Sequence, residues 1–267
     1  MTMTSRLWRG GHSAVANMCW PLGGWCLSGL KELREPQRRS QGLAIVLPGV
    51  EGRSTLNWSI AQGIDDSGFP GSIEIRDWTT GFWPFFLYHL RAHHRNRAQA
   101  AAIAREIIAY QDEHPGHSTY LIGHSGGAAM AAWVLEELPA GRTVTAAAML
   151  GPALPCNYPL ATALSRVEQA LWSFWTPLDV LYLGVGTLAC GNLDGSHAPS
   201  GGWVGFRPPP KTSPAEQALY QSRLRQCRFE PSMLGQGHFG GHMSWANRLF
   251  VAEEVAPRVF GERPSYA

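Results

Sequence analysis

The sequence predicts a single α/β domain with a mostly parallel sheet that is flanked by helices on both faces. From Gly42 onward, apolar runs typical of buried strands alternate with segments of helical periodicity. Strands that alternate with helices are joined by right-handed crossovers, which makes them parallel. The length of 267 residues fits one large α/β domain. We therefore expect an N-terminal arm, residues 1–41, followed by one domain, residues 42–267.

The composition indicates a folded chain and excludes several classes of protein. Hydrophobic residues make up 45% of the sequence and charged residues 16%, which supplies a core and excludes a disordered chain. The 22 Lys and Arg against 20 Asp and Glu leave a net charge of +2, which gives no electrostatic case for nucleic acid. The five cysteines are scattered, so neither a disulfide framework nor a structural zinc site is predicted. We expect free thiols, with a Cys19–Cys26 bridge as the alternative.

The N-terminal arm has features of a leader segment but not its full pattern. Ala14–Leu30 is moderately apolar and follows Arg6 and Arg9, as in a signal peptide, yet its core is less densely apolar. No uninterrupted apolar run reaches the about 18 residues that a membrane-spanning helix needs. We expect an arm that packs on the domain, no stable membrane insertion and a cytoplasmic location. Export or membrane attachment is the alternative.

Six segments of the sequence have the pattern of strands. A continuous apolar run predicts burial on both faces of the sheet, whereas an alternating pattern predicts a more exposed position. The first and third segments are continuous runs, and the second alternates. The predicted strands are Leu43–Leu47, Ser72–Trp78, Ser118–Ile122, Thr143–Leu150, Ala170–Trp175 and Arg225–Pro231.

The intervening segments place apolar residues at helical spacing between capping and breaking residues. The predicted helices are one that begins after Ser54, Asn96–Glu113, Ala128–Leu138, Ala161–Glu168, Asp179–Leu188 and Ala246–Val259. The Gly- and Pro-rich residues 191–217 do not fit this alternation. Because a long structureless loop in a compact domain usually covers or binds something, we expect a lid or binding loop there.

Gly123-His124-Ser125-Gly126-Gly127 has the form G-x-S-x-G, a sharp turn that exposes a serine at the top of a sheet. The motif alone is weak, but here an apolar strand leads directly into it and a helix leads directly out. Glycines are required because a side chain at either flank would strike the adjoining strand or helix. Ser125 is therefore the candidate nucleophile, and the backbone N–H of Gly126 is a candidate oxyanion donor.

A serine nucleophile needs a base, and the base needs an orienting acid. In this type of fold the chain order is Ser, acid, His. Asp179 follows the Ala170–Trp175 strand at the edge of the sheet where the acid must lie, although the same position suits a helix N-cap. Asp194, in an Asp-Gly turn, is the alternative acid.

The glycine-rich loop before the last helix contains both candidates for the base. We prefer His242 because it lies nearer the helix start, and His238 is the alternative base. One of the two could be the base while the other orders the loop. The tight glycine turn Pro48–Gly52 follows the first strand, and the backbone N–H of Val50 is the candidate for the second oxyanion donor.

Three further histidines, His89, His93 and His94, lie in a basic segment. Their H-x-x-x-H spacing can bind zinc, but the glutamate of the usual zinc motif is missing and no distant ligand is evident. We interpret them as a solvated helix start. The sequence therefore predicts no metal and no cofactor.

The Leu43–Gly52 segment, the GHSGG turn, the late Asp and the late His together resemble the α/β-hydrolase family over about residues 42–260. The resemblance implies Ser125 as nucleophile, Asp179 as acid, His242 as base, and an oxyanion hole formed by Val50 and Gly126. The GHSGG form is lipase-like. The turn expected to supply the second oxyanion donor reads Pro-Gly-Val-Glu-Gly, which argues against the esterases that have His-Gly-Gly-Gly there. The connection between the predicted strands Thr143–Leu150 and Ala170–Trp175 is short and leaves no room for a large cap domain.

These features predict a serine hydrolase that cleaves carboxylic esters with apolar acyl or aromatic groups, its partner being a small apolar ester. The alternatives are a thioesterase or acyltransferase with the same triad, and a catalytically silent binding protein on this scaffold. Of the 11 tryptophans, five are expected around the carboxyl ends of the strands, where they favour an apolar pocket. They are Trp78, Trp83, Trp175, Trp203 and Trp245, whereas Trp58 and Trp133 are assigned to the core.

Overall fold

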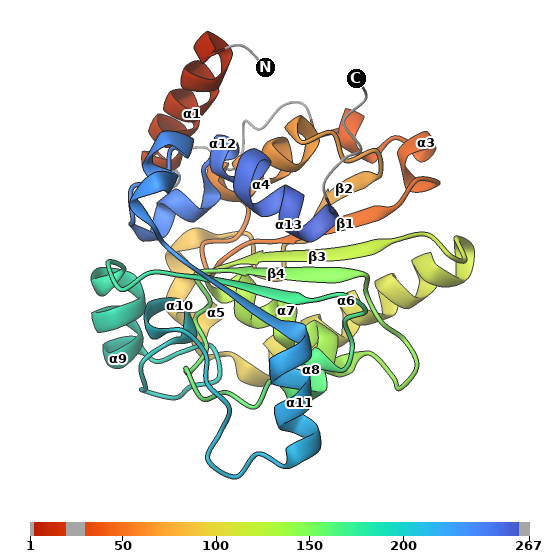
Figure 1. The fold of residues 1–267 in the computed structure, drawn as a ribbon, viewed down its shortest axis with the longest axis vertical. Coiled ribbons are helices and arrows are strands. Elements are labelled where there is room, and N and C mark those ends of the chain that lie inside the picture. Colours follow the sequence, from red (N-terminus) through yellow and green to blue (C-terminus); the bar gives the residue numbers. More distant parts are fainter. Residues whose placement is uncertain (1–2, 20–29, 262–267) are drawn as a thin grey trace.

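A computed structural model describes residues 3–19 and 30–261. The described residues form one six-stranded parallel sheet in the order β2-β1-β3-β4-β5-β6 (Figure 1). The strands are β1 Leu43–Leu47, β2 Ser72–Ile75, β3 Thr119–His124, β4 Ala146–Leu150, β5 Leu171–Trp175 and β6 Leu224–Arg228. The predicted parallel α/β architecture is confirmed. The β4–β5 connection contains only the short helix α8, Ala161–Leu164, and so holds no cap domain.

Helices cover both faces of the sheet (Figure 1). One core lies under α6 and α7, and the other lies under α4 and the C-terminal helices. The bounds are α4 Thr55–Asp66, α6 His93–Glu113, α7 Gly126–Glu137, α12 Arg248–Phe250 and α13 Ala256–Phe260, with a π-helical stretch Val251–Val255 between the last two. Every residue of β1, β3 and β4 is buried, as expected for strands covered on both sides.

Strand β2 lies at the edge of the sheet, but its burial differs from the prediction. All four of its residues are buried, including Glu74. The carboxylate of Glu74 pairs with Arg39 at 2.7 Å and also with Arg76. The polar position in the alternating pattern is therefore a buried, neutralised carboxylate and not a solvent-facing one.

The N-terminal arm contains helix α1, Met3–Met18, which packs against α4 and α12. The side-chain amide of Asn247 donates to the carbonyl of Gly10 at 3.0 Å, and the Arg248 N–H donates to the Ser13 hydroxyl at 2.9 Å. No helix within the described ranges is both long and apolar enough to cross a membrane. Cys19 is a free thiol, while Cys26 lies outside the described residues.

Residues 191–217 are not the structureless loop that their composition predicts. They contain α10, Gly201–Val204, and the start of α11, Pro214–Arg223. Backbone bonds fasten the segment to the loop after β4, for example Gly201 N–H to the Leu154 carbonyl at 2.7 Å. The side chain of Leu193 is fully buried. Glycine allows the backbone of this segment to pack closely against the loop after β4, since a Cβ on Gly202 would lie 2.6 Å from the backbone nitrogen of Pro152.

Candidate active site

Ser125 occupies a strained turn between β3 and α7. Its dihedrals are φ 56° and ψ −118°, and it is the only non-glycine residue with positive φ in the described part of the chain. The Ser125 N–H donates to the carbonyl of Leu150 at 2.9 Å, and its own carbonyl accepts from Ala153 N–H at 3.2 Å. The end of β4 thus holds the serine in a conformation that is costly for a residue with a side chain, a feature typical of functional positions.

The two flanking glycines are required by close backbone contacts. A Cβ on Gly123 would lie 2.1 Å from the carbonyl oxygen of Gly127. A Cβ on Gly127 would lie 2.2 Å from the carbonyl oxygen of Leu47. Both distances are far below van der Waals contact, so α7 can approach β1 and β3 this closely only with glycine at both positions.

Asp179 and His242 come together as the chain order predicts. Nδ1 of His242 lies 2.5 Å from Oδ2 of Asp179, and both side chains are buried. The other carboxylate oxygen accepts from the Leu183 N–H at 3.3 Å, at the start of the helical stretch Val180–Gly186. Both positions that the sequence suggests for Asp179, a helix N-cap and a partner of the histidine, are therefore present together. One carboxylate oxygen caps the helix and the other binds His242.

The alternative base and acid lie elsewhere. His238 is fully buried beside Trp245, its Nδ1 accepts from the Gly240 N–H at 2.9 Å, and burial lowers its pKa to about 3. It orders the loop and makes no hydrogen bond with Asp179 among the described interactions. Asp194 caps its own turn by accepting from the Ser196 N–H at 3.0 Å and does not bind His242. The structure thus brings together Ser125, Asp179 and His242 but neither alternative.

His124 supports the histidine loop, a role for which its sequence context contains no signal. Its Nε2–H donates to the main-chain carbonyl of His242 at 3.2 Å, and the two rings lie 4.8 Å apart. Complete burial lowers the pKa of His124 to about 3, so the ring is neutral. Tyr182 also stacks on His242, with ring centroids 5.0 Å apart. The general-base candidate therefore packs against two rings.

The candidate oxyanion donors are adjacent. A Cβ placed on Gly126 would lie 3.4 Å from the backbone nitrogen of Val50 and 2.9 Å from its Cγ1. Neither Val50 N–H nor Gly126 N–H has an acceptor among the described backbone bonds. A developing oxyanion requires donors of this kind, and these two unbonded amides lie close to each other beside Ser125.

The interpretation of His89 as a solvated residue is wrong. It is fully buried, and its Nδ1 lies 2.7 Å from the carbonyl oxygen of Val50. The sequence could not show this because the partner lies 39 residues earlier in the chain. His89 is thus part of the scaffold of the Pro48–Gly52 turn.

Glu51 is a second buried acid beside the site. Its carboxylate accepts from the Gly49 N–H at 3.2 Å and from the Ser54 hydroxyl at 3.3 Å. Burial raises the pKa of Glu51 to about 7, and these hydrogen bonds together with His242 limit the rise. The sequence pattern marks this residue only as a part of the glycine turn. A carboxyl group that titrates near neutrality therefore lies next to the candidate triad.

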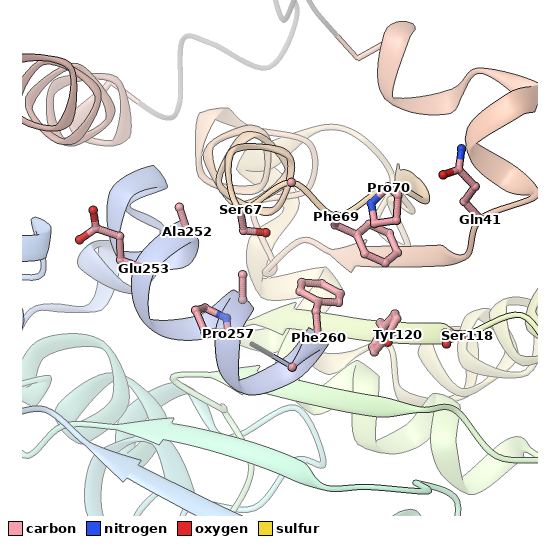
Figure 2. Close-up of a pocket in the computed structure, with 13 residues that line it drawn as sticks. Gln41, Ser67, Phe69, Pro70, Ser118, Tyr120, Ala252, Glu253, Pro257 and Phe260 are labelled. Atoms are coloured by element: carbon pink, nitrogen blue, oxygen red, sulfur yellow. The ribbon is translucent and has the colours of Figure 1, made fainter. Parts of the chain in front are cut away.

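Ser125, His242, Val50 and Glu51 line one cavity of about 250 Å³. The remaining wall is largely apolar and consists of Leu56, Trp83, Phe86, Tyr182 and Met243, with His124. A larger cavity of about 740 Å³ lies elsewhere (Figure 2). Its walls include Gln41 and Ser118, which precede β1 and β3, so it opens at the amino ends of the strands and away from Ser125.

Two stretches with exposed apolar side chains contribute Trp83, Phe86 and Tyr182 to the wall of the smaller cavity, and together we call them the apolar rim. They comprise Phe82, Trp83, Phe85, Phe86, Leu87 and Tyr88 beside α5 (Phe86–Arg91), and Leu178, Val180, Leu181, Tyr182, Val185 and Leu188 beside α9 (Thr187–Cys190). Within residues 82–88 and 178–188, the buried Asp179 is the only Asp, Glu, Lys, Arg or His. No residue of the expected lid, 191–217, lines the cavity.

The tryptophan prediction holds for Trp83 alone, which lines the cavity. Trp78 and Trp245 are fully buried in the core, and Trp175 and Trp203 do not line the cavity. Trp133, assigned to the core, is buried there. In the parts of the chain that the structure describes, no group of three or more His, Cys, Asp or Glu side chains is arranged to hold a metal ion.

The serine turn after β3, the acid after β5 and the histidine after β6 follow each other along one parallel sheet. The fold is that of an α/β-hydrolase. This agrees with the resemblance seen in the sequence, and the α/β-hydrolase arrangement places all three side chains at the carboxyl ends of the strands.

Comparisons with known proteins give similarity in structure only. No family model matches the sequence, and no curated protein matches it. Similar solved structures include the Trichoderma reesei cutinase in complex with a C11Y4 phosphonate inhibitor, with a TM-score of 0.41 and 12% identity over 94% of this chain and 90% of that chain. A cutinase-like protein from Cryptococcus sp. has a TM-score of 0.40 and 16% identity over 84% of this chain and 97% of that chain.

Proposed function

We propose that the protein is a serine hydrolase that cleaves carboxylic esters with apolar acyl or aromatic groups through an acyl-enzyme. The observation that supports this most strongly is the meeting, at one cavity, of Ser125 in its strained turn and the His242–Asp179 pair. A hydrolase of this type needs no metal or cofactor for the reaction.

In the proposed mechanism, Nε2 of His242 takes the proton of the Ser125 hydroxyl while the serine oxygen attacks the ester carbonyl carbon. The amides of Val50 and Gly126 donate to the oxyanion that forms. The tetrahedral intermediate collapses, its C–O bond breaks, and His242 returns the proton to the leaving alcohol. His242 next takes a proton from water while the water oxygen attacks the acyl carbon, and it gives this proton to Ser125 Oγ as the bond between the acyl carbon and Ser125 breaks and the carboxylic acid leaves. Asp179 keeps the His242 proton on Nδ1, which leaves Nε2 free to act as the base.

The lining of the cavity supports the apolar substrate class. Trp83, Phe86 and Tyr182 supply aromatic walls, and the apolar rim continues them to the surface without an exposed charge. An anionic substrate would lose hydration here without gaining a partner, because no Lys or Arg lines the cavity. An apolar acyl chain would instead bury surface worth about 25 cal/mol per Å². Thioester cleavage or acyl transfer by the same triad would differ only in the leaving group or the acceptor.

The test is hydrolysis of p-nitrophenyl esters from acetyl to palmitoyl by the wild-type protein and by Ser125→Ala. We expect turnover by the wild type, with a preference for apolar acyl groups, and none above background by the variant. Ser222→Ala, an exposed serine on α11, is the matched control. Undiminished turnover in folded Ser125→Ala, or no turnover of any ester by the wild type, would contradict the proposal. Acyl-CoA and alcohol acceptors in the same assay separate the thioesterase and acyltransferase alternatives.

A further inference from the structure

The direction of the Val50 amide depends on the carbonyl groups around it. Because the N–H and C=O of a trans peptide point in opposite directions, holding a carbonyl on one side directs the N–H to the other. The Gly49 carbonyl, in the same peptide unit as the Val50 N–H, accepts from the Gly52 N–H at 3.1 Å. The Pro48 carbonyl accepts from the indole N–H of Trp78 at 2.7 Å. The Val50 carbonyl is held by Nδ1 of His89 at 2.7 Å.

The surroundings of His89 determine which ring nitrogen carries the proton. The Thr80 N–H donates to Nε2 at 3.1 Å, and the Thr80 hydroxyl lies 2.7 Å from the same atom. Nε2 therefore accepts, and the proton lies on Nδ1, from which it is donated to the Val50 carbonyl. Burial lowers the pKa of His89, an effect that Arg95 strengthens while Asp77 and the Val50 carbonyl oppose it, so the ring is neutral at neutral pH.

The segment that carries His89 is itself fixed. The side-chain amide of Asn96 donates to the His89 carbonyl at 2.5 Å. The guanidinium group of Arg95 donates to the carbonyls of Trp78 at 2.8 Å and Thr79 at 2.7 Å. The Trp78 ring reaches the site too, since a Cβ on Gly126 would lie 3.5 Å from its Cζ2. A connected set of polar groups, buried or partly buried at most positions, thus links α5 and α6 to the turn.

We propose that His89 is a positioning residue for the oxyanion hole: by binding the Val50 carbonyl, it fixes the turn so that the Val50 N–H faces the reacting carbonyl. This inference rests on the proposed function. The Gly52 bond fixes the peptide unit before Val50, and the His89 bond fixes the unit after it. Without His89, rotation about the Val50 dihedrals is restrained on one side only, in a turn that contains glycines on both sides of Val50.

The activity test compares His89→Ala, His89→Asn and His89→Gln. The amide N–H of asparagine can take the place of Nδ1–H, whereas glutamine reaches the Nε2 position and leaves the Val50 carbonyl unbound. Loss of one oxyanion donor lowers kcat by about 100- to 1,000-fold, so a loosened donor should lower kcat by about 10- to 100-fold with KM little changed. We expect this loss in the alanine and glutamine variants and partial recovery in the asparagine variant. His94→Ala, an exposed histidine on α6, is the control.

Each rate is corrected for the folded fraction, which thermal unfolding measures. Equal losses in the asparagine and alanine variants, or a loss confined to KM, would overturn the inference.

A second measurement does not depend on activity: the ¹⁵N shifts of the His89 ring should report a neutral Nδ1–H tautomer at pH 7. An Nε2–H tautomer or a charged ring would overturn the proposed bond even if the protein hydrolyses esters. A correct tautomer in a protein that hydrolyses no ester would refute the proposed function and, with it, the role of His89 in positioning an oxyanion donor.

Discussion

The buried carboxyl group of Glu51 predicts how the free energy of unfolding changes with pH. The pKa of this carboxyl group is raised from 4.5 to about 7, so the folded protein binds the proton more tightly than the unfolded chain does. The penalty for ionisation is absent below pH 4.5, grows as the pH rises and is complete above pH 7. At about 1.4 kcal/mol for each pH unit, the difference between these values corresponds to about 3 kcal/mol of lost stability.

Replacing Glu51 with Gln removes this penalty and keeps an oxygen that can accept from the Gly49 N–H and the Ser54 hydroxyl. We expect Glu51→Gln to exceed the wild type in free energy of unfolding by up to about 3 kcal/mol near pH 8.5, with the gain vanishing near pH 4.5. Urea unfolding followed by tryptophan fluorescence measures this at both pH values. Glu35→Gln, at an exposed carboxyl group, controls for the change in net charge. A gain that is the same at both pH values, or a loss near pH 8.5, would refute the reasoning.

Three further predictions concern other parts of the structure. Asp179→Asn should lower kcat by about 10,000-fold, because the orienting charge for His242 is lost, while Asp194→Asn should leave kcat unchanged. Gly127→Ala should cost about 3 kcal/mol or more in thermal unfolding because its Cβ would lie 2.2 Å from the Leu47 carbonyl oxygen, and an unchanged Tm would contradict the packing described. Trp83→Ala should raise KM for long acyl esters more than for acetyl esters, and equal effects on both would argue against Trp83 as part of the acyl wall.

Much of the fold is predictable because its signals are local. Continuous apolar runs mark β1 and β3, and the order of strand, GHSGG turn and helix marks Ser125 from neighbouring residues alone. Asp179 can be placed because it follows β5 directly. Its two competing interpretations cannot be separated in the sequence because a carboxylate has two oxygens, and here each does one task.

The rest depends on contacts between distant segments. His89 resembles part of a solvated basic helix in the sequence because its partner, the Val50 carbonyl, is far away in the chain. Residues 191–217 resemble a lid because their Gly and Pro content does not reveal the backbone bonds to the loop after β4. Trp78 and Trp245 resemble pocket residues because they follow site elements in sequence, whereas their side chains are buried in the core. Such contacts require the folded arrangement to be known.

The central claim is that Ser125 is a nucleophile activated by His242. It is tested most directly by treating the protein with a fluorophosphonate and locating the adduct by peptide mass spectrometry. We predict one adduct, on Ser125, that is absent in Ser125→Ala and strongly slowed in His242→Ala, with both variants folded. No adduct on the folded wild-type protein, or an adduct on another residue while Ser125 stays unmodified, would contradict the account.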